Sequence, residues 1–579
     1  MYNLFMHKWI IGILFLGLVM GCSQSSLDLA SQLSVTSFQD CTENKNPPIP
    51  LEFPASAEFK SAYFPRIIDA PPQPGETLPI DNRSYLSLSF PHHQFESKGQ
   101  SQQAEVKLFD SKGNTLPIEG RKLKFSSAYP EQFSVDDKGQ VKALTENGES
   151  RIKVSAEDGS LVDAEAFVFI AQNRPNGISG QAWKIHSFSE LSQRRPLVTS
   201  NGKDQFVIAW YRSNPIGHQK NDLIFAQRYS LSGNPLGKEI QVTPAYFGNS
   251  AMKAVENQYP NLLMSISSNE KGEFAIVWLH IGEKKKIFAQ QYNSCGQALG
   301  SPLLLFTITE EALMDPIISY GLNREMAITW GVPKITAGDY SHPPERSEIW
   351  LQKFNTQGKP LHAAIQITTN GSGIKGSQIA MDGQGNAVVV YQEGLQLYFQ
   401  RFDHEMNRTH VAKAIDMSGG TPVADYNGFT QLEMNQKGDF IVSWSGAQPL
   451  IPNGLRRDLI LQLCHYDSNG NLKKPCKTEH SYDDFFNETR AAINRQGESI
   501  VIWLDTNDSF FRQLWNPLGV SQLTTEQIEI PITLPNSLKT RLNDNFDVAL
   551  FDNGKYIIVW ETFAENGLDT DIYAQIFSP

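Results

Sequence analysis

"FVIAWYRSNPIGHQKNDLIFAQRYSLSGNPLG" spans Phe206–Gly237, and much of it returns as "FAIVWLHIGEKKKIFAQQYNSCGQALG" at Phe274–Gly300. Each copy has an apolar run that ends in Trp, a second run rich in aromatic residues and Gln, and a Gly-containing turn. Short apolar runs separated by such turns predict antiparallel β-strands. The chain therefore contains a repeated unit built from strands.

The aromatic-ended strand occurs seven times, at intervals of 52 to 68 residues. Its last residues are Trp210, Trp278, Trp330, Tyr391, Trp444, Trp503 and Trp560. A unit of three or four strands cannot bury both of its faces alone, so neighbouring units must stack on it. Radial stacking achieves this without an exposed sheet edge, which predicts a seven-bladed β-propeller over residues 180–579 with these aromatic residues in its core.

The two ends of the repeat region complement each other. The first unit has a fourth strand, "KEIQVT" (Lys238–Thr243), whereas the last unit ends at "DIYAQIFSP" without one. An orphan strand, "GQAWKIHSF" (Gly180–Phe188), precedes the first unit. We expect this N-terminal strand to close the propeller by pairing with the last unit. The units resemble those of large bacterial surface and secreted proteins, a resemblance that implies no particular ligand.

Residues 81–172 show period-two alternation, as in "SYLSLSF" (Ser84–Phe90), which predicts a β-sandwich. Within this region, "SSAYP" (Ser126–Pro130), "VDDKGQV" (Val135–Val141) and "IKV" (Ile152–Val154) resemble the bacterial Ig-like domain of group 2. Such domains serve as spacers or adhesion modules, so the resemblance implies a place in the cell envelope. The predicted fold class is all-β: an Ig-like sandwich followed by the propeller.

The N-terminal residues resemble a targeting sequence. Lys8 precedes an apolar run from Trp9 to Met20 that is too short to span a bilayer, which is typical of a signal peptide over residues 1–21. "VMGC" (Val19–Cys22) resembles the lipobox of bacterial lipoproteins, which implies acylation of Cys22. Ser23 after it implies the outer membrane, on a side that the sequence does not define. The Pro-rich residues 22–80 predict an extended tether.

Composition limits the partners. The net charge is -12, and nucleic-acid binding needs a basic surface, so DNA and RNA are not expected. Of five cysteines, Cys464 and Cys476 flank the turn "DSNGN" and are candidates for a disulfide, with two free thiols as the open alternative. Cys41 and Cys295 have no assignable partner.

No catalytic motif is recognisable. The sialidase-type turn, Gly-x-Ser-x-Gly, His-Glu-x-x-His and a phosphate loop are all absent from the sequence, and no recurring acid on the first strands suggests a pair for glycoside hydrolysis. "DSNGN" (Asp467–Asn471) and "DGQGN" (Asp382–Asn386) fit hairpin turns better than calcium loops. We therefore expect no enzymatic activity, no cofactor and no metal site.

Long connections of variable length join second to third strands and fourth to first strands, and strand direction puts both sets on one face. Binding residues concentrate on such loops, so we expect ligand contacts there. The predicted contacts are Tyr211, His218, Tyr340, His342 and Arg346. The leading hypothesis is a lipid-anchored envelope protein whose propeller is a binding or scaffold platform for a protein or glycan. The alternatives are a glycan-active enzyme with unrecognised catalytic loops and a periplasm-facing outer-membrane assembly factor.

Overall fold

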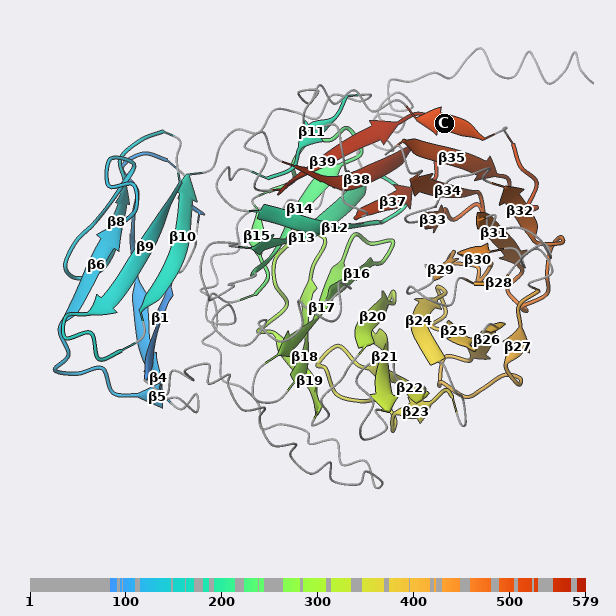
Figure 1. Cartoon of the computed structure of the whole chain (residues 1–579), viewed down its shortest axis with the longest axis horizontal. Coiled ribbons are helices and arrows are strands. Elements are labelled where there is room, and N and C mark those ends of the chain that lie inside the picture. The colour runs from blue at the N-terminus through green and yellow to red at the C-terminus, as the bar shows by residue number, and fades with distance from the viewer. Residues whose placement is uncertain are drawn as a thin grey trace, which may run out of the picture. The chain divides into compact units, whose positions relative to one another are not determined.

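The computed structural model describes residues 84–579 with gaps at 91–93, 96, 110–114, 147–148, 162, 171–180, 187–191, 214–222, 238, 244–263, 282–284, 309–313, 335–345, 369–373, 395, 417–420, 423–429, 448–458, 481–488, 505–508, 523–524, 529–544 and 564–569. All regular structure in these residues is β-strand, as predicted (Figure 1). None of the described segments is a helix long and apolar enough to cross a membrane.

The first ten strands form three small sheets, ordered β1-β4-β5, β2-β10-β9-β6 and β3-β8-β7. The strands are β1 (Tyr85–Ser89), β2 (Gln94–Phe95), β3 (Ser101–Gln103), β4 (Glu105–Phe109), β5 (Thr115–Leu116), β6 (Leu123–Ser127), β7 (Phe133–Val135), β8 (Gln140–Ala143), β9 (Glu149–Ala156) and β10 (Ala164–Ile170). The alternation read from the sequence is present: Leu86, Leu88 and Phe90 are buried and belong to one core with side chains of the other sheets. The specific Ig-like assignment stays a prediction.

Seven further sheets follow one another around a common centre (Figure 1). We number them as blades in chain order. They comprise blade 1, β12 (Ser192–Ser200), β13 (Gln205–Ser213), β14 (Leu223–Ser230) and β15 (Ile240–Gln241); blade 2, β16 (Met264–Ser268), β17 (Phe274–Ile281), β18 (Lys285–Tyr292) and β19 (Leu303–Ile308); blade 3, β20 (Met314–Tyr320), β21 (Met326–Lys334), β22 (Arg346–Phe354) and β23 (Ile365–Gln366); blade 4, β24 (Ile374–Met381), β25 (Ala387–Glu393), β26 (Gln396–Phe402) and β27 (Lys413–Ala414); blade 5, β28 (Thr421–Pro422), β29 (Thr430–Met434), β30 (Phe440–Ala447), β31 (Leu459–Tyr466) and β32 (Lys477–His480); blade 6, β33 (Thr489–Ile493), β34 (Ser499–Leu504), β35 (Phe510–Trp515) and β36 (Glu526–Ile528); and blade 7, β37 (Phe546–Leu550), β38 (Tyr556–Phe563) and β39 (Thr570–Phe577) with β11 (Trp183–Lys184).

Blade 7 contains the predicted pairing of the chain's two ends. Trp183 pairs with Ala574, and Lys184 pairs with Tyr573, so β11 is the outer strand of the last sheet. Asp547 of β37 accepts a hydrogen bond of 2.8 Å from the Val198 N–H of β12, which links blade 7 to blade 1. The chain therefore has the β-propeller architecture, with its N-terminal strand in the last blade.

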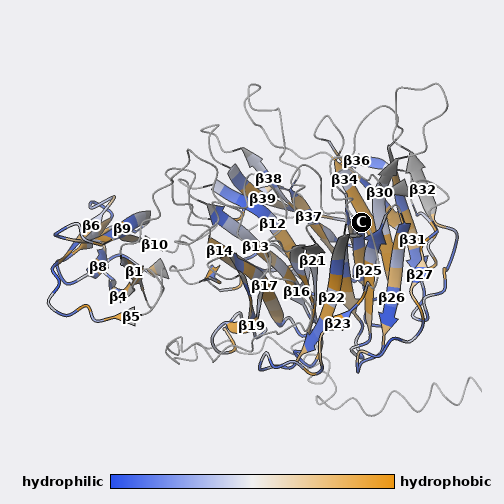
Figure 2. Cartoon of the chain, turned by 60° about the horizontal axis from the view of Figure 1, so that its bottom comes forward, coloured by the Kyte–Doolittle hydropathy of each residue, from blue (hydrophilic) through white to orange (hydrophobic). Residues whose placement is uncertain are grey.

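Second strands are buried on both faces because each lies between two neighbouring sheets. In β13, every residue from Phe206 to Trp210 is buried. Figure 2 shows apolar stretches, coloured orange, in the strands of the blades. The seven aromatic residues at the ends of these strands are between 0% and 6% exposed, which confirms their predicted place in the core.

Tight turns join each first strand to its second strand. Each turn is closed by a backbone hydrogen bond between residues four positions apart, such as that from the Asn201 N–H to the Gln205 C=O. Six of the seven turns place Gly in the left-handed region. In blade 3 the left-handed residue of the turn is Arg324, at φ 61°, a conformation that a non-Gly residue adopts uncommonly.

Candidate functional site

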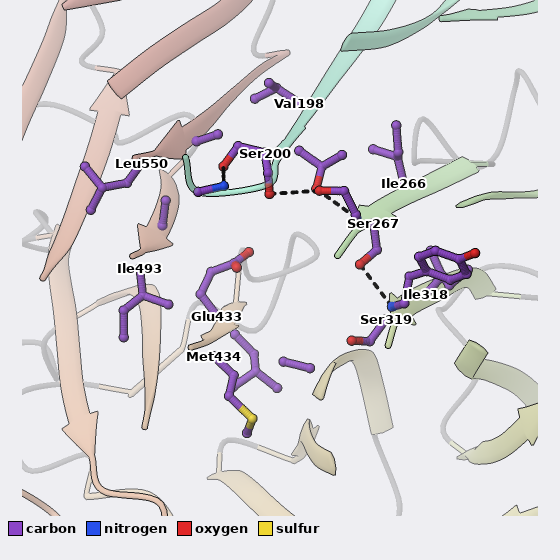
Figure 3. A pocket seen from close by; sticks show the side chains of 18 of the residues that line it. Val198, Ser200, Ile266, Ser267, Ile318, Ser319, Glu433, Met434, Ile493 and Leu550 are labelled. Carbon is purple, nitrogen blue, oxygen red and sulfur yellow. Dashed lines mark hydrogen bonds between the residues drawn. The ribbon is translucent and has the colours of Figure 1, made fainter. Parts of the chain in front are cut away.

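The first strands of all seven blades line one central cavity of about 260 Å³ (Figure 3). Because each first strand is the inner edge of its sheet, its unpaired backbone groups face this space or the next blade. The cavity therefore has a wall of main-chain donors and acceptors, to which side chains add.

The tight turns give a common register for the seven strands. Counting back from each turn, the last residues of the first strands are Ser200, Ser268, Tyr320, Met381, Met434, Ile493 and Leu550. The penultimate residues are Thr199, Ser267, Ser319, Ala380, Glu433, Ala492 and Ala549. Six of the seven penultimate residues are small, and Glu433 is the exception.

Small hydroxyl residues at the penultimate position link neighbouring blades. The N–H of Ser268 donates to Thr199 Oγ1 at 3.1 Å, and the N–H of Tyr320 donates to Ser267 Oγ at 3.1 Å. The N–H of Met381 donates to Ser319 Oγ at 2.9 Å. We call these three contacts the hydroxyl bridges; they join blades 1 to 4 in succession, and blades 4 to 7 have Ala or Glu at the bridging position.

Glu433 projects its carboxyl group into the cavity from β29 (Figure 3). Among the described residues, no hydrogen bond or ion pair reaches this carboxyl group. Burial, together with a smaller effect of the negative charge of Asp547, raises the pKa of Glu433 to about 8. Glu433 is therefore a protonated, unpartnered acid at neutral pH.

Asp547 is the second carboxyl group of the cavity and lies in β37. Burial raises its pKa to about 6, against the opposing effects of Arg490 and of hydrogen bonds from the Val198 and Val548 N–H groups. Its Oδ1 lies 3.8 Å from Nε of Arg490, on the neighbouring blade. Asp547 is thus largely ionised at neutral pH, so the cavity holds two carboxyl groups in opposite protonation states.

The end of the cavity at the tight turns is crossed by an ion pair. Arg495 follows β33 of blade 6, and its Nη1 lies 3.1 Å from Oε2 of Glu270, which follows β16 of blade 2. Arg495 also pairs with Asp552 of blade 7. These blades lie on opposite sides of the centre, so the Arg495–Glu270 pair spans the opening between the turns.

The predicted loop contacts lie mostly elsewhere or outside the described residues. Tyr211 lies in the buried run of β13, is only 7% exposed and belongs to the hydrophobic core, and its predicted role in binding stays a prediction. Arg346 is the first residue of β22 and pairs with Lys334. His218, Tyr340, His342 and the lipidation candidate Cys22 lie outside the described residues, as does most of the long-loop face.

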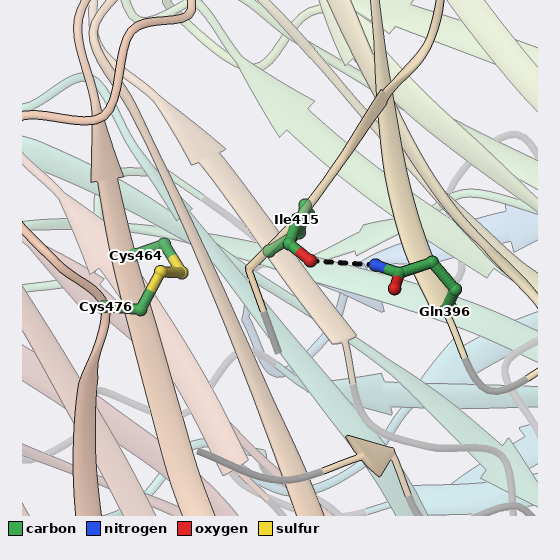
Figure 4. The surroundings of a disulfide bond; sticks show 4 residues. All are labelled: Gln396, Ile415, Cys464 and Cys476. Atoms are coloured by element: carbon green, nitrogen blue, oxygen red, sulfur yellow. Dashed lines mark hydrogen bonds between the residues drawn. A yellow bond between two sulfur atoms is a disulfide. The ribbon is translucent and has the colours of Figure 1, made fainter. Parts of the chain in front are cut away.

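Cys464 and Cys476 form a disulfide between β31 and the start of β32 in blade 5, the pairing that the sequence left open (Figure 4). Nearby, Gln396 Nε2 donates to the Ile415 carbonyl at 2.8 Å. Cys295, for which the sequence suggested no partner, is also disulfide-bonded. In the part of the chain that the structure describes, no group of three or more His, Cys, Asp or Glu side chains is arranged to hold a metal ion.

Sequence inspection missed Glu433 and Asp547 because neither acid recurs from unit to unit. A usable signal existed: when the units are aligned on their tight turns, Glu433 is the one large ionisable residue in a column of Thr, Ser and Ala. Asp547 and Arg490 occupy equivalent positions in adjacent blades, three residues before the strand end.

No protein-family model matches the chain. No curated protein matches it either. Similar solved structures include the Dos1 propeller (10% identity, TM-score 0.35, 69% of this chain and 96% of that one) and the NanB sialidase of Streptococcus pneumoniae (9%, 0.36, 86% and 93%). Another is the α-L-arabinofuranosidase Arb93A of Fusarium graminearum (10%, 0.33, 57% and 95%). At these identities the similarity concerns the fold alone.

The expectation that the chain is not an enzyme is corrected. It rested on the absence of recognisable motifs and of paired acids, but the structure places Glu433 and Asp547 in one cavity. Catalytic groups on a propeller need not recur in each blade, so the repeat pattern was the wrong place to look for them.

Proposed function

We propose that this protein is a cell-envelope protein whose propeller binds a glycan in the central cavity and cleaves it, with Glu433 as the general acid. The observation that carries the proposal is the position of Glu433. A hydroxyl at this position would bridge blades 5 and 6, as Ser267 and Ser319 bridge theirs. A half-buried carboxyl group without a partner costs stability, and residues that break a local structural rule are expected at functional sites.

The chemistry of the two carboxyl groups fits this proposal. Glycoside cleavage uses one carboxyl group that is protonated and one that is ionised, flanking the scissile bond. With pKa values raised to about 8 and about 6, Glu433 supplies the first and Asp547 the second at neutral pH. Arg490 and the Val198 N–H hold Asp547 in place, which would orient it as the base or nucleophile.

The proposal includes a lipid anchor at Cys22. The short apolar core and Gly21 before this residue support it. Substituting Cys22→Ala is expected to release the protein from the membrane fraction and to abolish incorporation of labelled fatty acid. Retention in the membrane with unchanged mass would contradict the anchor without affecting the cavity.

Activity is tested by incubating the full chain with a panel of neutral and acidic polysaccharides and measuring new reducing ends. General acid catalysis contributes about 10²- to 10⁴-fold, so Glu433→Gln is expected to lower kcat by at least about 100-fold while the protein remains folded. Ala549→Ser, at the equivalent position of blade 7, is the matched control and is expected to keep wild-type activity. Equal rates for wild type and Glu433→Gln would exclude the acid role.

A further inference from the structure

The charges around the cavity nearly cancel. Arg490 is opposed by Asp547 at 3.8 Å, and burial keeps Glu433 uncharged at neutral pH. At the tight-turn end, the single positive charge of Arg495 faces the carboxylates of Glu270 and Asp552. The described cavity wall therefore offers no excess positive charge that would attract an anion.

The cavity wall instead presents main-chain hydrogen-bond donors next to main-chain acceptors. In an antiparallel pair of strands, hydrogen-bonded and non-hydrogen-bonded residue pairs alternate. The tight turn closes with a hydrogen-bonded pair, so the last residue of each first strand forms a non-hydrogen-bonded pair with the residue opposite it on the second strand. Its N–H and C=O groups therefore point away from the second strand. In blades 2 to 4 the N–H groups are used by the hydroxyl bridges. Among the described residues, no acceptor reaches the N–H groups of Met434, Ile493 or Leu550.

Half of the ring thus presents open main-chain groups beside Glu433. A donor next to an acceptor matches a hydroxyl group, which both donates and accepts, better than it matches a carboxylate or phosphate, which only accepts. The cavity of about 260 Å³ also lies just below the roughly 300–1,000 Å³ of pockets for drug-sized ligands, which limits the buried part of a ligand to a small unit.

We infer that the cavity recognises an uncharged, hydroxyl-rich sugar unit and discriminates against uronate, sialate and phosphorylated sugars. This inference rests on the proposed function and narrows its substrate class. Glu433 donates its proton to a sugar oxygen, and the open N–H and C=O groups of blades 5 to 7 hold neighbouring hydroxyls. An acidic sugar would bring a negative charge beside Asp547 and beside the acidic end of the cavity, without an unpaired cation to receive it.

The test is a glycan array that carries neutral and acidic glycans in matched pairs, probed with the full chain, followed by calorimetric titration of the best pair at pH 6.5. We expect a neutral member to bind at least about tenfold more tightly than its uronate or sialate counterpart. We also expect Glu433→Ala to weaken binding of the neutral member at least about tenfold, with Val411→Ser, an exposed position that does not line the cavity, unchanged. Tighter binding of the acidic member would overturn the inference and leave the proposed function standing. Absence of binding to every glycan on the array would overturn both.

Discussion

Arg495 of blade 6 forms an ion pair of 3.1 Å with Glu270 of blade 2, 225 residues earlier in the chain, across the end of the central cavity. Both side chains are about 30% exposed, so solvent and salt weaken the pair. Since Arg495 also holds Asp552, it links three blades at one point.

A double-mutant cycle with Arg495→Ala and Glu270→Ala is expected to give a coupling energy of about 0.5–1 kcal/mol that falls as salt is raised. Denaturant unfolding at low and high ionic strength measures it. Arg495→Ala alone is expected to cost more than Glu270→Ala, because it also leaves Asp552 without its cation. A coupling energy of zero at low salt would show that the pair does not link the two sides.

Glu433→Ser is expected to stabilise the protein while abolishing its activity. The new hydroxyl would occupy the position of Ser267 and Ser319 and accept the Ile493 N–H, and the buried carboxyl group would be gone. One added hydrogen bond contributes about 1 kcal/mol. Thermal unfolding followed in parallel with the activity assay measures both effects.

Ala549→Ser is the control for that experiment, since it adds the equivalent hydroxyl without removing Glu433. We expect it to raise the Tm and keep the activity. If Glu433→Ser destabilised the protein, Glu433 would be a structural residue and the functional assignment would lose its basis.

Glu433 also predicts how stability depends on pH. The group is protonated in the folded state up to a pKa of about 8 and ionises near its ordinary value of 4.5 in the unfolded chain. The folded state therefore binds the extra proton between these values, so this group makes stability fall as pH rises from about 4.5 to 8. Asp547 likewise makes stability fall as pH rises from 3.8, its ordinary pKa, to about 6, its pKa in the folded state.

Glu433→Gln is expected to remove the loss of stability that Glu433 causes as pH rises towards 8. The free energy of unfolding of this variant, relative to that of the wild type, should therefore be higher at pH 9 than at pH 5. Unfolding midpoints across this range measure it. Parallel stability curves for wild type and variant would show that the carboxyl group is not protonated in the folded state.

His186, directly after β11, predicts a second and opposite pH effect. Complete burial lowers its pKa to about 4, although the Asp571 carboxylate at 3.1 Å opposes the shift, while Lys184 and Arg212 reinforce it. Because the unfolded residue titrates near 6.5, stability is lost as pH falls from about 6.5 to 4. This loss of stability should first affect the pairing of β11 with β39.

Amide hydrogen exchange at pH 7 and pH 5, corrected for the intrinsic exchange rate at each pH, is expected to show lower protection of Lys184 and Tyr573 in acid. His186→Gln should reduce the difference between the two pH values. Deleting Gly180–Phe188 should expose the edge of β39 and promote aggregation at any pH. Unchanged monomeric behaviour and Tm after the deletion would show that β11 contributes nothing to the last blade.

The repeat made most of the propeller predictable from sequence. Trp210 and its equivalents mark the buried second strands, and the missing fourth strand after Phe577 correctly predicted the pairing with β11. The repeat failed where single blades depart from it: Arg324 stands at a turn position where blade 2 and blades 4 to 7 have Gly, and Glu433 stands where the other blades have small residues. Local periodicity cannot find such positions, because they are defined by alignment across blades and by burial in a space that exists only after folding.

The pairing of β11 with β39 also sets an order of events during folding. His186 and Ile572, which meet at this junction, are 386 residues apart, so the first propeller strand to be synthesised must wait for the last one. Contacts of such long sequence separation form slowly, because the loop between them must be organised first. Blades 1 to 6 can each assemble from neighbouring residues as they appear, whereas blade 7 can be completed only after β39 has been synthesised. A ribosome-stalled chain lacking Thr570–Phe577 would therefore hold a nearly complete propeller with an unpaired strand at each end.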